Sequence, residues 1–356
     1  MSVRDVIIVG AGPSGLSAAI AAKQRGLDYQ VLEQGVLVNS IYRFPPQMVF
    51  FTTPELLEIG GLPFVSPFDK PTRAEALKYY RKVVDTHDLQ IEYGEKVRSV
   101  TPGADRIFTV ETESADGARR SRQARNVVMA IGYFDRPVMV GVPGEDLPHV
   151  HHYYGEPHPY YRQRVVIVGG GNSAAESALE MYRAGARVTI VHRAPTLKPT
   201  IKYWVRPDIE NRIKEGSIAA HFNAAVREIR PASVVIGPSK GEQPPVPDDI
   251  VFPEDGSKDF EAPARPGLRT ELEVPADAVF LLTGYRADAE LLRHAGVSLN
   301  ERQAPVHDSA TYETNVSGLF VAGGAIAGVD TGTIFIENGR FHGEKIIQVI
   351  AARDKV

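Results

Sequence analysis

The feature that most constrains this chain is a pattern of strand, glycine turn, helix and strand that occurs twice. The first copy begins with a β-branched strand at residues 5–9, continues through a helix at 16–23 and ends with a strand at 29–33. This is the length of one βαβ unit, about thirty residues. The second copy starts roughly 160 residues later, with strands at 164–168 and 187–191 and a helix at 175–184. The repeat predicts two dinucleotide sites in one polypeptide.

The first glycine turn, Gly10-Ala-Gly12-Pro-Ser-Gly15, has the spacing of a dinucleotide-binding fingerprint. Gly10 permits the tight turn, Gly12 lets the backbone approach a pyrophosphate, and Gly15 lets the helix pack closely on the strand. Glu33 ends the second strand, where a carboxylate accepts hydrogen bonds from both hydroxyls of an unphosphorylated ribose. This copy therefore predicts FAD or NAD rather than NADP.

The second copy differs at the end of its last strand, where no carboxylate is present. Val191 is followed by His192 and Arg193, so a cation stands near the expected ribose position. Arg193 is the first choice for binding a 2′-phosphate, with His192 and Lys198 as helpers. NADPH is thus favoured over NADH. The alternative, NADH with Arg193 as a solvated surface charge, stays open.

One flavin signature and one NADPH signature together imply hydride transfer from nicotinamide to flavin, a step that the cofactors themselves carry. The protein would contribute by holding the reacting atoms within about 3.5 Å of each other. The sequence therefore predicts an enzyme whose two domains each bind one cofactor.

Other segments indicate how the domains connect. Buried runs at 126–132 and 278–284 each end in Gly followed by Tyr and resemble crossings between domains. Residues 237–268 are rich in Pro, Gly, Asp and Glu, which predicts an exposed hairpin or loop of the second domain. The tail is expected to complete the first domain with strands at 319–324 and 333–336 and a closing helix from about residue 339.

Composition excludes several other classes. The chain has 356 residues, a formal charge of -4 and no Cys, so disulfide scaffolds, thiolate metal sites and redox chemistry through a cysteine of its own are excluded. No basic tract points to a nucleic-acid partner. Residues 6–22 are uncharged, but Asp5 and the patterned glycines indicate folded core rather than a signal peptide. We expect a cytoplasmic protein with no membrane segment.

The order of the motifs resembles the low-molecular-weight thioredoxin reductases, in which an NADPH domain is inserted into an FAD domain. Over residues 1–350 the chain is more narrowly similar to the bacillithiol-disulfide reductase family. The motifs that carry this resemblance are Ser40-Ile-Tyr, residues 144–149 (Gly-Glu-Asp-Leu-Pro-His), 201–208 (Ile-Lys-Tyr-Trp-Val-Arg-Pro-Asp), Thr314-Asn-Val, and 334–343 (Ile-Phe-Ile-Glu-Asn-Gly-Arg-Phe-His-Gly).

The resemblance implies an α/β fold of two Rossmann-like, three-layer dinucleotide-binding domains. The FAD domain would comprise residues 1–137 and 286–356, and the inserted NADPH domain residues 138–285. Motif matching and resemblance together give FAD-binding candidates at Gly10, Gly12, Pro13, Ser14, Gly15, Glu33, Gln34, Ser40, Tyr42, Val97, Ala130, Gly132, Gly323 and Gly324. The NADPH-binding candidates are Gly169, Gly171, Asn172, Ser173, Ala174, His192, Arg193, Lys198, Thr283 and Gly284.

The departures from these families bear on the electron acceptor. Thioredoxin reductases carry a CxxC where this chain has residues 152–155, His-Tyr-Tyr-Gly, so an internal dithiol is excluded. Bacillithiol-disulfide reductases typically carry a Cys where this chain has Ser14, and a serine cannot form a mixed disulfide. Flavin disulfide reductases usually have an Asp on the ribityl chain where Gly323-Gly324 stands, so main-chain groups would have to serve here.

The resemblance implies an NADPH-dependent FAD oxidoreductase that reduces a low-molecular-weight disulfide such as bacillithiol disulfide, as a homodimer. Catalytic residues are not identified, and Ser14 and His152 are the only candidates. Two alternatives remain: a flavin monooxygenase-like enzyme, suggested by Thr53-Pro54 and the segment 144–149, and a ferredoxin or flavodoxin–NADP reductase. A binding protein that senses NADPH without turnover is the non-enzymatic alternative.

Two groups of side chains have weaker implications. Four histidines, at positions 149, 151, 152 and 158, lack the spacing of a catalytic zinc motif, so no metal site is predicted. Aromatic residues near the first glycine turn could line the isoalloxazine or belong to the core, and Trp204 could shield the nicotinamide. These aromatic residues are Tyr42, Phe44, Phe50 and Phe51.

Overall fold

The computed structural model describes residues 2–239, 268, 270–329 and 331–353. The chain divides into two compact units. Unit 1 comprises Met1–Pro137 and Tyr285–Val356, and unit 2 comprises Val138–Gly284. Most of the segment 237–268, predicted as a Pro-rich loop, lies outside the described residues.

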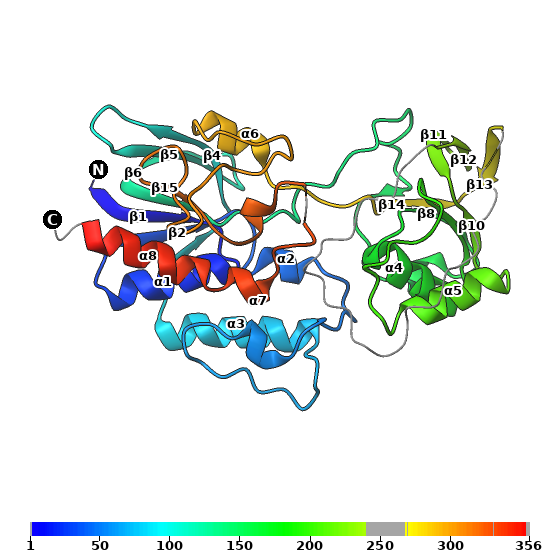
Figure 1. Cartoon of the computed structure of the whole chain (residues 1–356), viewed down its shortest axis with the longest axis horizontal. Coiled ribbons are helices and arrows are strands. Elements are labelled where there is room, and N and C mark those ends of the chain that lie inside the picture. The colour runs from blue at the N-terminus through cyan, green and yellow to red at the C-terminus, as the bar shows by residue number, and fades with distance from the viewer. Residues whose placement is uncertain (1, 240–267, 269, 330, 354–356) are drawn as a thin grey trace. The chain divides into compact units, whose positions relative to one another are not determined.

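Unit 1 is built on a sheet whose parallel part has the order β3-β2-β1-β6, with β15 pairing on β6 (Figure 1). β2, β15, the second half of β1 and the carboxyl-terminal end of β6 are buried on both faces, because helices cover one side and further strands and α6 the other. The amino-terminal half of β6 continues into an antiparallel meander with β5 and β4. The strands are β1 (Val3–Val9), β2 (Tyr29–Glu33), β3 (Ile91–Tyr93), β4 (Glu95–Pro102), β5 (Phe108–Ser114), β6 (Arg119–Met129) and β15 (Leu319–Val321).

Two apolar clusters form the core of unit 1. The larger lies between the parallel strands and helices α1, α3 and α8, and includes Leu16, Tyr80 and Ile346. The smaller lies on the other face, under the meander and α6. The helices are α1 (Pro13–Gln24), α2 (Asn39–Tyr42), α3 (Arg73–His87), α6 (Ala289–His294), α7 (Ile336–Gly339) and α8 (His342–Arg353), with 3₁₀ turns η1 (Pro54–Leu57) and η4 (Gly323–Ala327).

Unit 2 repeats this plan with a five-stranded parallel sheet of order β10-β9-β8-β14-β7 in its described residues. Helices α4 and α5 cover one face, and an antiparallel sheet of order β11-β12-β13 covers the other (Figure 1). The elements are β7 (Val150–His151), η2 (His158–Tyr160), β8 (Arg164–Val168), α4 (Asn172–Arg183), β9 (Arg187–Val191), α5 (Arg206–Lys214), β10 (Ala219–His221), β11 (Ala224–Arg230), β12 (Ser233–Pro238), β13 (Leu272–Pro275) and β14 (Ala278–Leu281). The prediction of two three-layer, Rossmann-like units is confirmed.

One predicted element is wrong. Residues 333–336 do not form a strand, and the closing helix begins at His342 rather than near Gly339. The Asn338 side chain folds back, accepting from the Phe335 N–H at 2.9 Å and donating to the Thr333 carbonyl at 3.0 Å. This local capping starts the short helix α7 where the apolar run alone indicated a strand.

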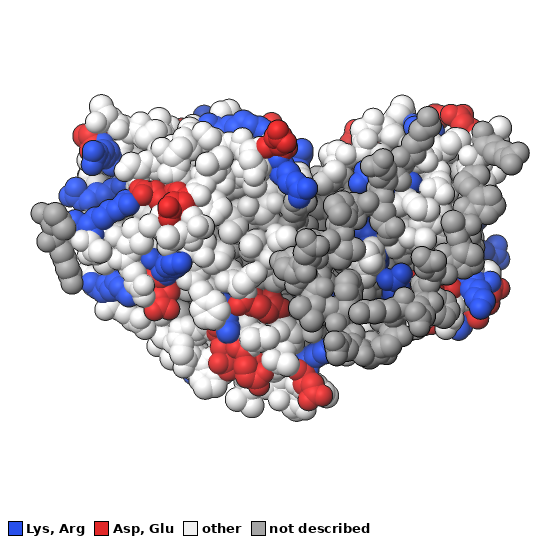
Figure 2. Space-filling model, in the orientation of Figure 1, with Lys and Arg blue, Asp and Glu red and all other residues white. Residues whose placement is uncertain are grey.

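The described surface of unit 1 is electrostatically mixed. Figure 2 shows basic and acidic side chains as neighbours over its visible face. Ion pairs such as Arg353–Glu313 at 2.6 Å and Lys23–Asp88 at 2.9 Å account for part of this mixing. None of the helices in the described ranges combines the length and the apolar character needed to cross a bilayer.

Candidate cofactor-binding sites

The first glycine turn joins β1 to α1 and needs glycine for steric reasons. Gly10 has φ +105°, and a Cβ there would lie 2.4 Å from the Ala130 carbonyl oxygen. A Cβ at Gly15 would lie 2.0 Å from the Gly10 carbonyl oxygen. Gly12 is different, since a Cβ there would meet nothing within 4 Å. Gly12 therefore borders open space at the amino-terminal end of α1, where backbone N–H groups favour an anion.

Glu33 fastens this turn to the end of β2. The side chain is buried, and its two oxygens accept from the N–H groups of Ala11 and Gly35, both at 2.8 Å. Burial, with a smaller contribution from Asp135, raises the pKa of Glu33 above its ordinary value despite these hydrogen bonds. A carboxylate has about four acceptor positions, so acceptor capacity remains for a ribose.

A cavity of about 240 Å³ opens beside this turn, within unit 1. Its wall comes from the glycine turn, the segment after β2, the start of β4, the segment after β6 and the segment before α7. Predicted FAD-binding residues that line it are Gly10, Gly12, Pro13, Ser14, Glu33, Gln34, Ser40, Val97, Ala130, Gly132 and Gly324. The parallel strands direct these loops to one edge, where ligands bind in such sheets.

Three predicted residues are absent from this lining. Gly15 is buried in the packing of α1 on the sheet, and Gly323 lies beneath the cavity wall, where a Cβ would meet the Ser14 Oγ at 2.3 Å. Tyr42 is exposed, with the Arg73 guanidinium 5.6 Å from its ring. Among the other aromatic candidates only Phe44 lines the cavity, while Phe50 is buried in the core and Phe51 is exposed.

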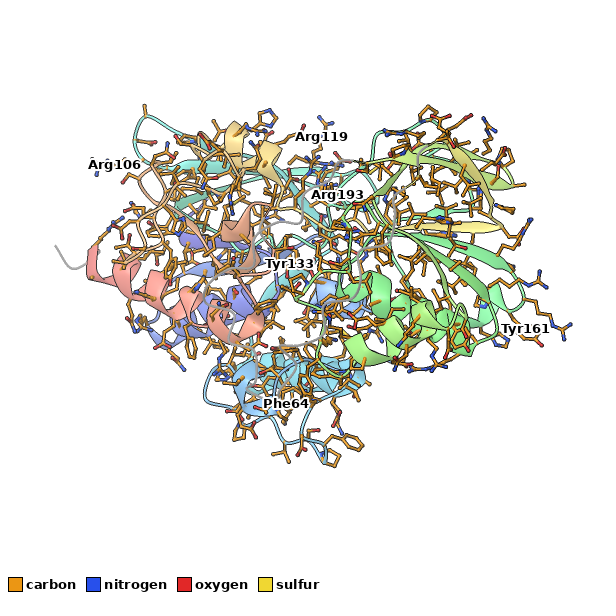
Figure 3. The ribbon with its side chains drawn as sticks, turned by 45° about the vertical axis from the view of Figure 1, so that its right-hand side comes forward. Phe64, Arg106, Arg119, Tyr133, Tyr161 and Arg193 are labelled. Atoms are coloured by element: carbon orange, nitrogen blue, oxygen red, sulfur yellow. The ribbon has the colours of Figure 1, made fainter. Side chains whose placement is uncertain are left out.

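Sequence reasoning missed several lining residues, among them Asn39, Tyr133 (labelled in Figure 3) and Asp135. Tyr133 packs so closely on Gly324 that a Cβ at Gly324 would lie 2.6 Å from the tyrosine ring. Both Tyr133 and Asp135 follow β6, which ends at Met129. The buried run that ends in Gly132-Tyr133 is the available sequence signal, although it indicates only a domain crossing and an FAD-binding glycine at position 132.

The turn at Gly323-Gly324, which stands where flavin disulfide reductases usually have Gly-Asp, is held in place by a buried histidine. Gly323 has φ +59°, and its N–H donates to His342 Nδ1 at 3.1 Å. His342 is buried and stacks on Tyr312, with ring centroids 4.3 Å apart. Burial, followed by the charges of His307 and Lys345, lowers the pKa of His342 to about 4. The imidazole is therefore neutral near pH 7 and accepts the Gly323 hydrogen bond.

Ser14 also contacts this region. Its Oγ donates to the Gly339 carbonyl oxygen at 2.9 Å, which ties α1 to α7. The side chain is therefore engaged in a structural hydrogen bond across the chain.

The second glycine turn, between β8 and α4 in unit 2, requires glycine for the same steric reasons as the first. Gly169 has φ +148°, and a Cβ there would lie 2.4 Å from the Leu282 carbonyl oxygen. Gly171 precedes α4, which starts at Asn172. The Asn172 side chain accepts from the Lys202 N–H at 2.8 Å and donates to the Thr200 carbonyl at 3.0 Å. Asn172 thereby orders the loop that follows β9.

The expected ribose end of this unit is cationic. Arg193 (Figure 3) is exposed, while burial and Arg193 lower the pKa of Lys198. Burial, with Lys198 and Arg193, lowers the pKa of His192 to about 4. His192 packs on Gly170, where a Cβ would lie 2.5 Å from the imidazole, and its buried Nε2 has no hydrogen-bond partner within the described residues. The structure brings these candidates to the edge of the second glycine turn.

The remaining candidates of unit 2 lie elsewhere. Thr283 Oγ1 donates to the Val138 carbonyl at 2.7 Å, and Gly284 has φ +107°, so both shape the crossing of the chain. His152 Nε2 lies 3.8 Å from Glu145 Oε1. In the described part of the chain no three His, Cys, Asp or Glu side chains come together as a metal site.

Comparisons with known proteins identify the family of the chain. The pyridine nucleotide-disulphide oxidoreductase family matches residues 7–262 and 268–323. Bacilliredoxin reductase Bdr of Bacillus subtilis is 40% identical over 355 residues, covering 99% of each chain. The structure of bacillithiol disulfide reductase Bdr from Bacillus cereus is 38% identical with a TM-score of 0.88, covering 99% of this chain and 100% of that one. That from Staphylococcus aureus is 36% identical, with a TM-score of 0.84 and 99% coverage of both.

Proposed function

Because the chain belongs to the pyridine nucleotide-disulphide oxidoreductase family, we propose that it reduces a low-molecular-weight disulfide, such as bacillithiol disulfide, with electrons from NADPH through FAD. The observation that carries this proposal is the contrast between the two glycine turns. The turn of unit 1 ends at a carboxylate, Glu33, whereas that of unit 2 ends beside two cations, Arg193 and Lys198. We further infer that the enzyme is a cytoplasmic homodimer.

The residues of unit 1 fit FAD. Gly12 leaves open space before α1, which suits a pyrophosphate, and Glu33 keeps acceptor capacity for ribose hydroxyls. When bound, FAD supplies the two-electron chemistry that links a nicotinamide to a disulfide. The neutral His342 would keep Gly323 in place, so that main-chain groups of the following Gly324 face the cofactor.

The residues of unit 2 fit NADPH. Two cations beside a glycine turn favour a dianionic 2′-phosphate over the bare hydroxyl of NADH. The buried Nε2 of His192, which lacks a partner within the described residues, would gain a hydrogen bond from a bound ligand. His192 would act there as a neutral group, because its pKa is about 4.

The chain restricts the manner of disulfide reduction. It contains no cysteine, and Ser14, which occupies the position where related enzymes carry a thiol, donates its hydrogen bond to the Gly339 carbonyl. A mixed disulfide between protein and substrate is therefore impossible. The substrate would be reduced without a covalent bond to the chain.

The test is anaerobic reduction of the FAD-loaded protein with NADPH, followed by rapid mixing with bacillithiol disulfide. We expect bleaching of the flavin absorbance by NADPH and its prompt return with the disulfide. Flavin that stays reduced with the disulfide but is reoxidised by ferredoxin would refute the proposal, as would accumulation of an oxygenated flavin on aeration.

Arg193→Gln tests the cofactor assignment in the same assay. We expect it to weaken NADPH binding and to leave NADH binding nearly unchanged. Arg187→Gln is the matched control, because Arg187 is an exposed arginine at the start of β9, the strand that precedes Arg193, and lies at the opposite end of that strand from the glycine turn. Equal effects of both variants on NADPH would contradict the role of Arg193.

A further inference from the structure

One carboxylate at the FAD cavity gathers an unusual number of donors from a single short segment. Asp135 Oδ1 accepts from Arg43 Nη1 at 2.8 Å and from Asn39 Nδ2 at 3.2 Å. Its other oxygen, Oδ2, accepts from Gln34 Nε2 at 2.9 Å. Hydrogen bonds to an ionised acceptor are stronger than neutral ones. Asp135 therefore fastens the residues 34–43 at three points.

The two ends of this network face the same cavity. Residues 34–43 follow β2 and Glu33, and Asp135 follows β6. Gln34, Asn39 and Asp135 all belong to the cavity wall. The rings of Phe44 and Phe134 also meet between these loops, with centroids 4.9 Å apart, and the hydrogen bonds of Asp135 add polar contacts that help to set the spacing of the walls at the end of the cavity marked by Glu33.

The fastened segment is held in a strained conformation. Val38 lies in its middle with φ +46°, a left-handed conformation that a β-branched residue rarely adopts. The side chain is buried, and its N–H donates to the Ala11 carbonyl inside the first glycine turn at 3.2 Å. Such strain persists only where surrounding contacts fix it, and it is common at ligand clamps.

We propose that Asp135 is a positioning residue that latches residues 34–43 over the ribose end of the FAD cleft and thereby sets the rate at which FAD leaves. The inference rests on the proposed function in taking FAD as the ligand. Without the carboxylate, the Arg43–Asp135 ion pair is lost, and so are the hydrogen bonds that the amides of Gln34 and Asn39 donate to Asp135. The strained segment is then free to relax away from Glu33.

The test measures FAD dissociation from the holoenzyme by the rise of free-flavin fluorescence after a large dilution into flavin-free buffer. Asp135→Asn keeps the side-chain shape but removes the charge, and we expect FAD to leave at least about tenfold faster, the effect of losing one charge-assisted hydrogen bond. Arg43→Met removes one donor and should accelerate release severalfold. It also carries the test if Asp135→Asn does not fold.

The control is Asp277→Asn in unit 2. Asp277 accepts three hydrogen bonds from Arg164, so the chemical change is matched, but it lies outside the FAD unit. We expect its FAD dissociation rate to stay within twofold of the parent protein.

A second readout separates a latch from a merely structural contact. If Asp135 acts as a latch, Asp135→Asn should reduce the rise in Tm that FAD causes. If Asp135 makes only a structural contact, the variant should lower the Tm of the apoprotein and of the holoenzyme by the same amount. The inference is overturned by a parallel loss of Tm, or by dissociation from Asp135→Asn within twofold of the parent. If the parent protein binds no FAD, the proposed function itself fails, which is a distinct result.

Discussion

His342 should make the stability of unit 1 depend on pH, and Asn is the substitution that isolates this effect. The imidazole accepts the Gly323 N–H while neutral, and burial lowers its pKa to about 4 from an ordinary value of 6.5. A base with a lowered pKa in the folded protein stabilises the fold above pH 6.5. That stabilisation is lost as the pH falls from 6.5 towards 4.

The magnitude follows from these two pKa values. At about pH 5 His342 is protonated in the unfolded chain but neutral in the folded chain. The free energy of unfolding is therefore about 2 kcal/mol lower than at about pH 7.5. In His342→Asn the amide oxygen replaces Nδ1 as acceptor and does not titrate. The variant loses the stacking on Tyr312, a cost of about 1 kcal/mol at either pH. His307 and Lys345, whose charges act on His342, remain in both proteins.

The assay is urea unfolding of the apoproteins at both pH values, followed by far-ultraviolet circular dichroism. The stability of the variant relative to the parent should improve by about 2 kcal/mol on going from about pH 7.5 to about pH 5. The single tryptophan, Trp204, belongs to unit 2 and should report no difference between the proteins. A relative stability that changes by less than about 0.5 kcal/mol would refute this account of His342.

Four further substitutions have expected outcomes. Gly10→Ala should destabilise the apoprotein by about 2 kcal/mol in chemical unfolding, because the added Cβ would strike the Ala130 carbonyl oxygen. Gly12→Ala should leave the stability of the apoprotein unchanged, but it should weaken FAD binding at least about tenfold in fluorescence titration. Lys198→Met should weaken NADPH more than NADH. Since the pKa of Lys198 is lowered, the NADPH preference of the parent should decline at alkaline pH while that of the variant stays flat. Ser14→Ala should cost about 1 kcal/mol of apoprotein stability, measured by urea unfolding, by removing one hydrogen bond.

The sequence predicts the parallel cores of both units well. The strands at 29–33, 164–168 and 187–191 have the bounds expected for them, because buried β-branched runs between glycine turns permit little else. The helix expected at 16–23 begins earlier, at Pro13, where a proline suits the first turn. Local pattern and tertiary structure agree at these positions.

The sequence predicts least about side chains whose roles depend on a hydrogen-bond partner elsewhere in the chain. Asp135 belongs to no motif, and its role depends on Arg43, 92 residues away in the chain. His342 lies in the segment 334–343, but nothing in that segment indicates that its partner is the Gly323 N–H, 19 residues away. No spacing rule reveals such pairs. The meander of β4 to β6 was missed for a related reason, since its polar outer faces give a weak periodic signal.

The discontinuity of unit 1 has a consequence for the nascent chain. A Cβ at Gly343 would lie 2.5 Å from the Ser14 carbonyl oxygen, so the backbone of α8 rests directly on α1. The glycine turn of unit 1 is therefore translated before unit 2, whereas the helix that supports it is translated after unit 2. Unit 2 is contiguous and can fold on the ribosome while its host is still half-made. We therefore expect unit 1 to bind its cofactor only after α8 has been translated.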